Sequence, residues 1–405
     1  MNSSSKKTLP PVEQDLPQKV VRKPVAKKVT AQAQEGRAIS KRVSRATPKP
    51  AEKAPKQVKI PKILCLFNHK GGVSKTTTAF NLGWMMATQK KRVLLADFDP
   101  QCNLTGMVLG FKGIEDLENT YCSEPPNNVK DGLAPAFESK PRQIVGVDCS
   151  QVVGNPNLFL LPGHIGLAEY ETTLGIAQEL SGSLLALRNL PGALRYLLDR
   201  TAEKYDIDYV IVDMSPSLGP INQNLLMTCD NFIVPLHPDY FSSMALSSLA
   251  KSLPRWSAWA NAAYDIDVLR DADYPFPKPH AQFIGAIIQK YRPRNGQPSA
   301  AFERWIGRLR DGLENELVPS LEKAGLLDRD LFKSKVNFSP FEPLLSVADF
   351  NSLIALSQEH QIPVYGLTAR GLKQKGKVWQ QTSANMKVFE KAFKDCSEKI
   401  MALTK

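Results

Sequence analysis

The sequence predicts an α/β fold, a doubly wound and mostly parallel sheet with helices on both faces. Apolar runs rich in Val, Ile and Leu alternate along the chain with helical segments, which is typical of parallel strands covered on both sides. A glycine-rich turn follows the first run and opens a helical segment at 76–90. We expect strands at 63–69, 92–99, 157–163, 209–215, 231–237 and 283–289, with 360–366 as a less regular candidate.

The segments between these strands are less regular. Residues 110–156 are rich in Gly, Pro and Asn, which predicts loops with short helices. Residues 166–200 read as largely helical, with breaks near Gly182 and Pro191, and 262–281 as an inserted loop. No internal repeat is present. We therefore expect one large domain over residues 61–405.

The first 60 residues differ in composition from the rest. They contain 15 Lys or Arg against 4 Asp or Glu, seven prolines and no aromatic residue. Such a segment buries too little apolar surface to offset its ordering entropy, so we expect a disordered basic tail at 1–60. Its charge favours an anionic partner and a DNA-tethering arm, although a solvated linker fits the same composition. The other 345 residues are nearly neutral, with 37 Lys or Arg against 36 Asp or Glu.

The composition also excludes several classes of protein. No apolar stretch follows the early lysines, which argues against a signal peptide, and no run approaches the ~18 apolar residues of a membrane-spanning helix. The six cysteines are scattered without a CxxC pair. We therefore expect a reduced, zinc-free protein of the cytoplasm.

The stretch NHKGGVSKTTTAFNLG, residues 68–83, predicts a phosphate-binding loop. A glycine-rich turn between a buried strand and a helix presents backbone N–H groups and the helix N-terminus to a phosphate. Lys75 would reach the β- and γ-phosphates of a nucleotide, and the Thr76 hydroxyl would ligate Mg²⁺. Ser74 replaces the last glycine of the general pattern, at a cost of ~1 kcal/mol if the position needs a positive φ. The residues expected to bind the cofactor here are Lys70, Gly71, Gly72, Val73, Ser74, Lys75, Thr76 and Thr77.

Together with KGGVSKTT, the additional Lys70 resembles the deviant Walker motif of the ParA/MinD superfamily of ATPases. In that family the corresponding lysine reaches across a dimer to the phosphates bound by the other subunit. The resemblance therefore implies a homodimer that encloses two ATP molecules with Mg²⁺, with Lys70 and Lys75 both taking part in catalysis.

Further segments resemble the same family. VLLADFDPQCNLTG, residues 93–106, is similar to its second motif, in which Asp99 falls on the carboxylate that positions the attacking water and the metal shell. Asp97 on the same strand reads equally well as a buried capping carboxylate, and Cys102 stands where the family commonly has glycine. YDIDYVIVDMSPSLG, residues 205–219, is similar to the Walker B strand, so Asp213 would hold Mg²⁺ through water. A segment at 231–246 resembles one that passes near the adenine, which implies cofactor contacts for Pro238 and Asp239.

Two other branches of the superfamily are less similar. MinD-type proteins end in a membrane-targeting amphipathic helix, and residues 386–403 do show apolar residues at helical spacing, but a last helix packed on the domain fits as well. Nitrogenase-type reductases need cluster-ligating cysteines, which the scattered cysteines here do not match. We therefore expect a ParA-type protein with no membrane partner.

ParA-like proteins bind DNA without sequence preference and release it when a partner stimulates hydrolysis. The resemblance thus implies non-specific DNA, a ParB-like adaptor and a nucleoid-associated location, with the cargo left open among a chromosome, a plasmid and a protein assembly. The alternatives are a nucleotide-switched scaffold with negligible turnover and a MinD-like membrane ATPase. Two basic clusters are the candidate DNA contacts, the first of which we expect on one helix face. They comprise Arg304, Arg308 and Arg310, and Arg370, Lys373 and Lys375.

Overall fold

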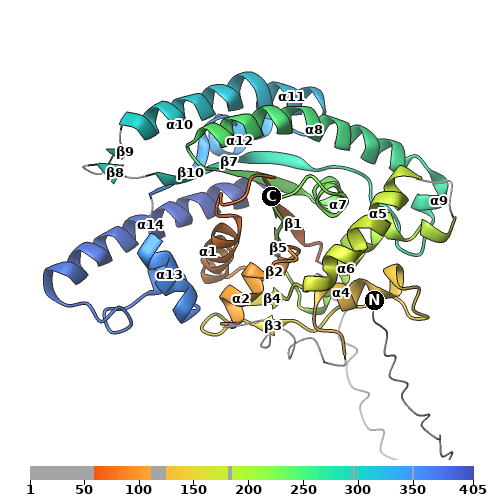
Figure 1. Ribbon diagram of the computed structural model, residues 1–405, viewed down its shortest axis with the longest axis horizontal. Coiled ribbons are helices and arrows are strands. Elements are labelled where there is room, and N and C mark those ends of the chain that lie inside the picture. Colours follow the sequence, from red (N-terminus) through yellow and green to blue (C-terminus); the bar gives the residue numbers. More distant parts are fainter. Residues whose placement is uncertain are drawn as a thin grey trace, which may run out of the picture. The chain divides into compact units, whose positions relative to one another are not determined.

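A sheet of mostly parallel strands forms the centre of the protein (Figure 1). The computed structural model describes residues 59–110, 125–180, 185–291, 293–294, 297–298, 300–348 and 351–405. Over these residues the sheet has the order β10-β7-β6-β1-β5-β2-β4-β3, and β3 alone runs antiparallel to its neighbour. The strands are β1 Lys62–Leu66, β2 Val93–Asp97, β3 Ser150–Gln151, β4 Leu158–Leu161, β5 Tyr209–Asp213, β6 Asn231–Leu236, β7 Gln282–Tyr291 and β10 Pro343–Ala348, with a separate hairpin of β8 Pro293–Arg294 and β9 Gln297–Pro298.

Helices cover both faces of this sheet (Figure 1). On one side α1 and α14 pack against each other, and on the other α7 packs between α5, α6 and α8. The α-helices are α1 Lys75–Thr88, α2 Asn103–Leu109, α4 Val129–Phe137, α5 Glu169–Glu179, α6 Leu190–Lys204, α7 Pro220–Thr228, α8 Tyr240–Tyr264, α9 Asp267–Arg270, α10 Ala300–Gly312, α11 Val318–Lys323, α12 Arg329–Val336, α13 Asn351–His360 and α14 Gly376–Leu403. Short 3-10 helices are η1 Ile165–Ala168, η2 Leu185–Leu187 and η4 Val364–Gly366, and η3 Leu313–Leu317 is a π-helical segment between α10 and α11.

The predicted doubly wound fold is confirmed. Central strands such as β2 and β5 are buried at all five positions, because each is covered by helices on two faces. The strand order reverses at β1, whose neighbours are β6 and β5. In sheets of this kind a ligand crevice forms where the order reverses, at the carboxyl ends of the strands.

Two expectations about the sheet are wrong. The expected strands did not include β10, which pairs in parallel with β7. Residues 360–366 form no strand but the end of α13 and the turn η4. The reason lies in α1, where Asn81 accepts a hydrogen bond from Val364 N–H and its carbonyl accepts one from the Tyr365 hydroxyl. These bonds hold the segment on the helix instead of in the sheet.

The last helix is part of the folded domain. The apolar residues of its second half are buried against the core, which confirms the packed-helix interpretation of 386–403. Two hydrogen bonds fix it, from Ser397 to Gln89 at the end of α1 and between Thr404 and Tyr209 at the start of β5. No helix among the described residues is long and apolar enough to cross a membrane. The predicted disordered tail lies outside the described residues up to position 58.

Candidate functional site

The glycine-rich loop, residues 67–74, joins the carboxyl end of β1 to the first turn of α1. Strand pairing places Leu66 opposite Asp213 and, across β5, Asp97 opposite the same Asp213. The loop and the two aspartates therefore meet at one edge of the sheet, where the strand order reverses.

Two residues at this edge adopt the left-handed backbone conformation that favours glycine. Ser74 precedes α1 with φ 60° and ψ 34°, and Cys102 precedes α2 with φ 52° and ψ 33°. These are the two positions at which the sequence departs from the glycines of the ParA pattern. The loop geometry is kept, and each residue carries strain on the order of 1 kcal/mol. The Ser74 hydroxyl is also buried without a hydrogen-bond partner among the described residues.

The two lysines of the loop contact different partners. Lys75 is 7% exposed, and its Nζ donates to the carbonyl of Asn68 at 2.9 Å. Burial lowers the pKa of Lys75, while the nearby charge of Asp213 acts in the opposite direction. Lys70 instead places its Nζ 2.5 Å from Oδ2 of Asp239 at the start of α8. The ammonium group of Lys75 thus lies inside the loop, and that of Lys70 lies beside the loop, on Asp239.

Asp239 uses its two carboxylate oxygens for different purposes. Oδ1 accepts a hydrogen bond from Ser242 N–H at 2.8 Å and caps α8, whereas Oδ2 pairs with Lys70. Burial acts to raise the pKa of Asp239, but the bonds from Lys70 and Ser242 outweigh it and hold the pKa below its usual value. Pro238 beside it is buried. The adenine contacts expected of this pair stay a prediction.

Asp213 ends β5 with both carboxylate oxygens buried and without a hydrogen bond of ordinary length among the described residues, although the Thr76 hydroxyl is near enough to act on its pKa. Burial raises its pKa to about 8, and the charge of Asp97 adds to the rise, while Thr76 and Lys75 act to lower it. A buried carboxylate that is not fully hydrogen-bonded is costly for the fold. Asp213 can therefore accept further hydrogen bonds from an added group, such as metal-bound water.

Asp97, by contrast, is satisfied inside the fold. Its Oδ2 accepts hydrogen bonds from the N–H and the hydroxyl of Thr105 at 2.8 and 2.6 Å, and that hydroxyl accepts one from Gly163 N–H. Burial raises the pKa of Asp97 to about 6 in spite of these bonds. Asp97 thus connects β2 to α2 and to the end of β4. Asp99 follows it, is 6% exposed, and accepts a hydrogen bond from Gln101 N–H at 3.0 Å.

Two residues that the sequence did not indicate hold the segment 214–219 after β5. The amide of Asn222 donates to two backbone carbonyls of this segment, each at 2.9 Å. Glu171 on α5 lies so close to Gly219 that a Cβ there would overlap its carboxylate. Asn222 acts on residues five and seven positions before it, whereas Glu171 reaches the segment from a helix distant in sequence.

Both sides of the glycine-rich loop carry exposed apolar side chains. On one side Pro216 lies against Gly71, and the neighbouring Leu218 is 43% exposed. The other side is the first turn and a half of α8, next to the Lys70–Asp239 pair. Its exposed residues are Tyr240 at 54%, Phe241 at 65% and Met244 at 54%.

The first predicted basic cluster is not a single face. Arg304 and Arg308 are exposed on α10, and the Arg308 guanidinium stacks on the Trp305 ring at 4.6 Å. Arg310 points elsewhere and pairs with Glu342 at 2.9 Å. The expectation that all three arginines share one face is therefore wrong for Arg310, because two positions along a helix turn the side chain by about 200°.

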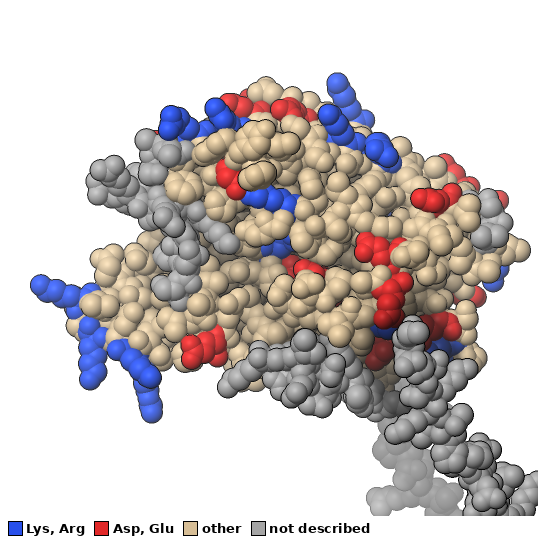
Figure 2. All heavy atoms as spheres, in the orientation of Figure 1, with Lys and Arg blue, Asp and Glu red and all other residues tan. Residues whose placement is uncertain are grey.

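The second cluster, here called the basic tip, consists of exposed residues before and in the first turn of α14. Figure 2 shows Lys and Arg side chains projecting from this end of the molecule. The side chains stand well separated from one another in that view, as like charges in solvent do. The basic tip comprises Arg370, Lys373, Lys375 and Lys377.

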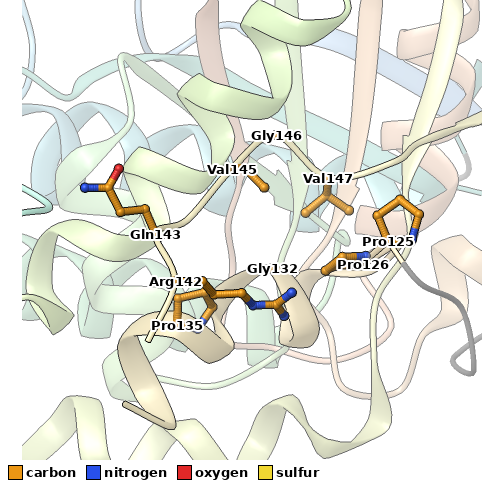
Figure 3. A pocket seen from close by; sticks show the side chains of 9 residues that line it. All are labelled: Pro125, Pro126, Gly132, Pro135, Arg142, Gln143, Val145, Gly146 and Val147. Atoms are coloured by element: carbon orange, nitrogen blue, oxygen red, sulfur yellow. The ribbon is translucent and has the colours of Figure 1, made fainter. Parts of the chain in front are cut away.

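No group of three His, Cys, Asp or Glu side chains among the described residues forms a set of metal ligands. A Mg²⁺ site built from one or two protein groups and substrate phosphates does not need such a group. Hollows elsewhere do not involve the loop. Figure 3 shows a pocket of about 30 Å³ between α4 and residues 142–147, far below the roughly 300 Å³ of small-ligand sites. A hollow of about 360 Å³ lies between α8 and α11.

Comparison with known proteins adds to this geometry. Residues 61–266 match the family described as AAA domain. The chain is 32% identical to the sporulation initiation inhibitor protein Soj of Bacillus subtilis over 194 residues, 47% of this chain and 64% of Soj. It is 30% identical to the chromosome partitioning protein ParA of Caulobacter vibrioides over 206 residues, 51% of this chain and 67% of that protein. The chain belongs to the ParA/MinD superfamily of P-loop ATPases.

Solved structures agree with the ParA-like fold. An ATP complex of McdA from Cyanothece covers 82% of this chain with a TM-score of 0.50 at 15% identity. A protein of Corynebacterium diphtheriae covers 77% of the chain with a TM-score of 0.51 at 23% identity. Each of these solved chains is covered almost completely, by 96% and 98%.

Proposed function

We propose that this protein is a ParA-type ATPase that binds Mg·ATP at the glycine-rich loop and hydrolyses it. The observation that carries the proposal is the state of the groups around the loop. Neither oxygen of Asp213 has a hydrogen bond of ordinary length among the described residues, and the buried Lys75 ammonium donates to a backbone carbonyl. Both groups are placed to exchange these surroundings for those of a bound nucleotide.

Each residue has a role in this site. Lys75 and the N–H groups of residues 71–77 hold the β- and γ-phosphates at the start of α1, where the helix dipole favours negative charge. Asp99 orients the attacking water. Mg²⁺, when bound, would neutralise phosphate charge, held by the Thr76 hydroxyl and through water by Asp213, with Asp99 in the outer shell. Pro238 and Asp239 border the nucleotide beside β6.

The apolar surface beside the loop supports a homodimer formed on ATP. Large exposed apolar side chains gathered in one place mark a surface for protein–protein contact. Leu218 on one side and Phe241 on the other leave the loop between them, so a second copy related by a two-fold axis would cover both. In this dimer Lys70 of one subunit contacts the phosphates held by the other.

We further propose that the dimer binds DNA without sequence preference and that a ParB-like adaptor stimulates slow hydrolysis. Exposed Arg304 and Arg308 and the basic tip supply cations for phosphate contacts. The protein would then position DNA or another cargo in the cytoplasm, on the nucleoid. Arg310 contributes less, because its charge is already paired with Glu342.

The first experiment measures ATP turnover with Mg²⁺ for the wild type, Lys75→Ala and Lys251→Ala. Lys251 is exposed on α8 and serves as the matched control. Lys75→Ala is expected to lose at least about 100-fold in turnover, since it removes a charged donor to the transferred phosphoryl group. Wild-type turnover in that variant would refute the assignment.

A salt series of DNA binding with ATP tests the basic tip. Lys373→Glu combined with Lys375→Glu is expected to weaken binding and to reduce the slope of log affinity against log salt by about 2. The control combines Lys333→Glu with Lys335→Glu, which has the same spacing at the end of α12. Equal effects of the two pairs would show that only net charge matters.

One alternative has an observation in its favour. The strained backbone at Ser74 and Cys102 is compatible with a nucleotide-switched scaffold in which ATP binds but is hardly hydrolysed. Single-turnover hydrolysis separates the two functions, because a scaffold leaves bound ATP intact for hours. A MinD-like membrane ATPase has no such support, since the apolar face of α14 is buried in the domain.

A further inference from the structure

Lys70 is fully engaged within its own subunit. Its Nζ lies 2.5 Å from Asp239 Oδ2 and 3.2 Å from the Ser242 hydroxyl, and its side chain is only 19% exposed. The backbone at Lys70 is held as well, because its N–H donates to the side chain of Asn68 at 3.0 Å. Asn68 in turn donates to the carbonyl of Pro235 at the end of β6. The side chain therefore points to the β6–α8 side of the loop.

The acceptor of this ion pair is itself fixed. Asp239 caps α8 through Ser242 N–H at 2.8 Å, and the Ser242 hydroxyl accepts a hydrogen bond from His237 N–H at 3.1 Å. His237 Nδ1 lies 3.7 Å from Asp239 Oδ2. The carboxylate thus sits in a rigid frame at a helix N-terminus, where negative charge is favoured. The fixed carboxylate therefore favours a single position of the Lys70 ammonium group.

We propose that Asp239 is a positioning residue that restrains Lys70 inside the free subunit and must release it before the dimer can close. The inference rests on the proposed function, in which Lys70 contacts nucleotide phosphates across the dimer. One ammonium group cannot hold Asp239 at 2.5 Å and reach a partner's phosphates at the same time. The free subunit is therefore biased toward the restrained state. Its apparent affinity for a second subunit is lowered in proportion to the small fraction of molecules in which Lys70 is released.

This role differs from capping alone. Capping uses Oδ1 and the neutral amide of asparagine serves it equally well, whereas restraint of Lys70 uses the charge at Oδ2. Asp239→Asn therefore removes the restraint and keeps the cap. The matched control is Asp328→Asn, since Asp328 caps α12 through the N–H groups of Asp330 and Leu331.

The first readout is the reactivity of Lys70 in the full-length protein without nucleotide. Reductive methylation with mass-spectrometric readout of the Lys70 peptide is expected to proceed about three to ten times faster in Asp239→Asn, as befits loss of a partly buried charged pair. Asp328→Asn is expected to label at the wild-type rate. Equal labelling of Lys70 in all three proteins would overturn the proposal.

The second readout is the protein concentration at which half of the protein is dimeric with Mg·ATP, measured by analytical ultracentrifugation. Asp239→Asn is expected to lower this concentration about three- to tenfold when the nucleotide is saturating for both proteins, and Asp328→Asn is expected to leave it at the wild-type value. A higher midpoint in Asp239→Asn would mean that Asp239 supports the dimer, and would overturn the restraint. Absence of dimer in wild type and variants, with ATP still bound, would instead refute the dimer mechanism on which the inference rests.

Discussion

Charged groups have opposite surroundings at the two ends of the central strands, here called the amino edge and the carboxyl edge of the sheet. At the amino edge, Asp230 accepts hydrogen bonds from Ile63 N–H and from His280, both at 2.8 Å, and lies 3.6 Å from Arg195. At the carboxyl edge, neither oxygen of Asp213 has a hydrogen bond of ordinary length among the described residues. Burial raises the pKa of Asp213 to about 8, whereas His280 and Arg195 hold that of Asp230 below its usual value in spite of burial.

The difference does not come from burial, because Asp230 is 7% exposed and Asp213 fully buried. It comes from the donors that the chain supplies. One edge is completed by residues of this chain alone, and the other combines a buried unpaired carboxylate with two strained residues. The polar groups are thus satisfied at the amino edge and left unsatisfied at the carboxyl edge. This difference indicates that a ligand added at the carboxyl edge would stabilise the fold.

The largest effect is expected at the amino edge. Asp230→Asn should lower the free energy of unfolding by about 3 kcal/mol, because it leaves the buried Arg195 without this charged partner. Urea unfolding measures the loss, and ATP turnover per folded molecule should not change. A loss below 1 kcal/mol would mean that Asp199, which also pairs with Arg195 at 3.0 Å, is sufficient.

The same substitution at the carboxyl edge should have the opposite sign. Asp213→Asn is expected to raise the free energy of unfolding of the nucleotide-free protein at pH 7 by about 1 kcal/mol, because a neutral amide replaces a carboxyl group that burial penalises, as its pKa of about 8 shows. ATP turnover should be lost. Calorimetry without nucleotide measures the first effect, and a destabilised variant would show that Asp213 is satisfied in solution.

A smaller effect is expected from backbone strain. Ser74→Gly should stabilise the protein by about 0.5 kcal/mol, since relief of the left-handed conformation exceeds the added entropy of the unfolded chain. Ser243→Gly, in the helix α8, is the control and should destabilise by a similar amount. Thermal unfolding of both variants tests the prediction, and equal signs would contradict it.

A final effect, of about the same small size, depends on pH. Both ring nitrogens of His280 face acceptors, the carbonyl of Lys278 at 2.9 Å and Asp230 at 2.8 Å, so the doubly protonated imidazole can donate to both. The Asp230 hydrogen bond raises the pKa of His280 although burial acts against it. Its stabilisation is therefore complete below the usual histidine pKa and is lost as pH rises through the raised pKa.

For this half-exposed side chain we expect only about 0.5 kcal/mol, because solvent screens the pair. His280→Gln should consequently lower the melting temperature more at pH 5.5 than at pH 9. Wild type and variant with parallel pH profiles would show that the proton on His280 contributes nothing.

The order of the fold was largely predictable from the sequence, and the exceptions have physical causes. Runs such as 209–212 are apolar at every position, which fits strands buried on both faces. Strand β10 gives no such signal, since it begins with Pro343 and is only partly apolar. Residues 360–366 are apolar enough for a strand, but Asn81 of α1 binds them, and no local pattern reveals that contact.

Site residues that belong to one short motif were predictable from the sequence. The contacts that these residues make with other parts of the chain were not. The loop, Asp99 and Asp213 follow from short patterns at strand ends. The ion pair of Lys70 and Asp239 joins residues 169 positions apart, and Asn222 and Glu171 hold the segment after β5 from other helices. The left-handed backbone at Ser74 could be expected only if the serine kept the conformation of the glycine that it replaces, because serine itself disfavours that conformation.

The connection between α1 and α14 has a mechanical consequence. Helix α1 starts at the glycine-rich loop and ends beside Ser397 of α14, whose opposite end carries the basic tip. With its 28 residues, α14 is about 42 Å long, so a tilt of about 5° at the packed end displaces the other end by about 4 Å. A rotation of α1 at the loop that tilts α14 by this angle would therefore move the basic tip by about the spacing between consecutive Cα atoms, ~3.8 Å.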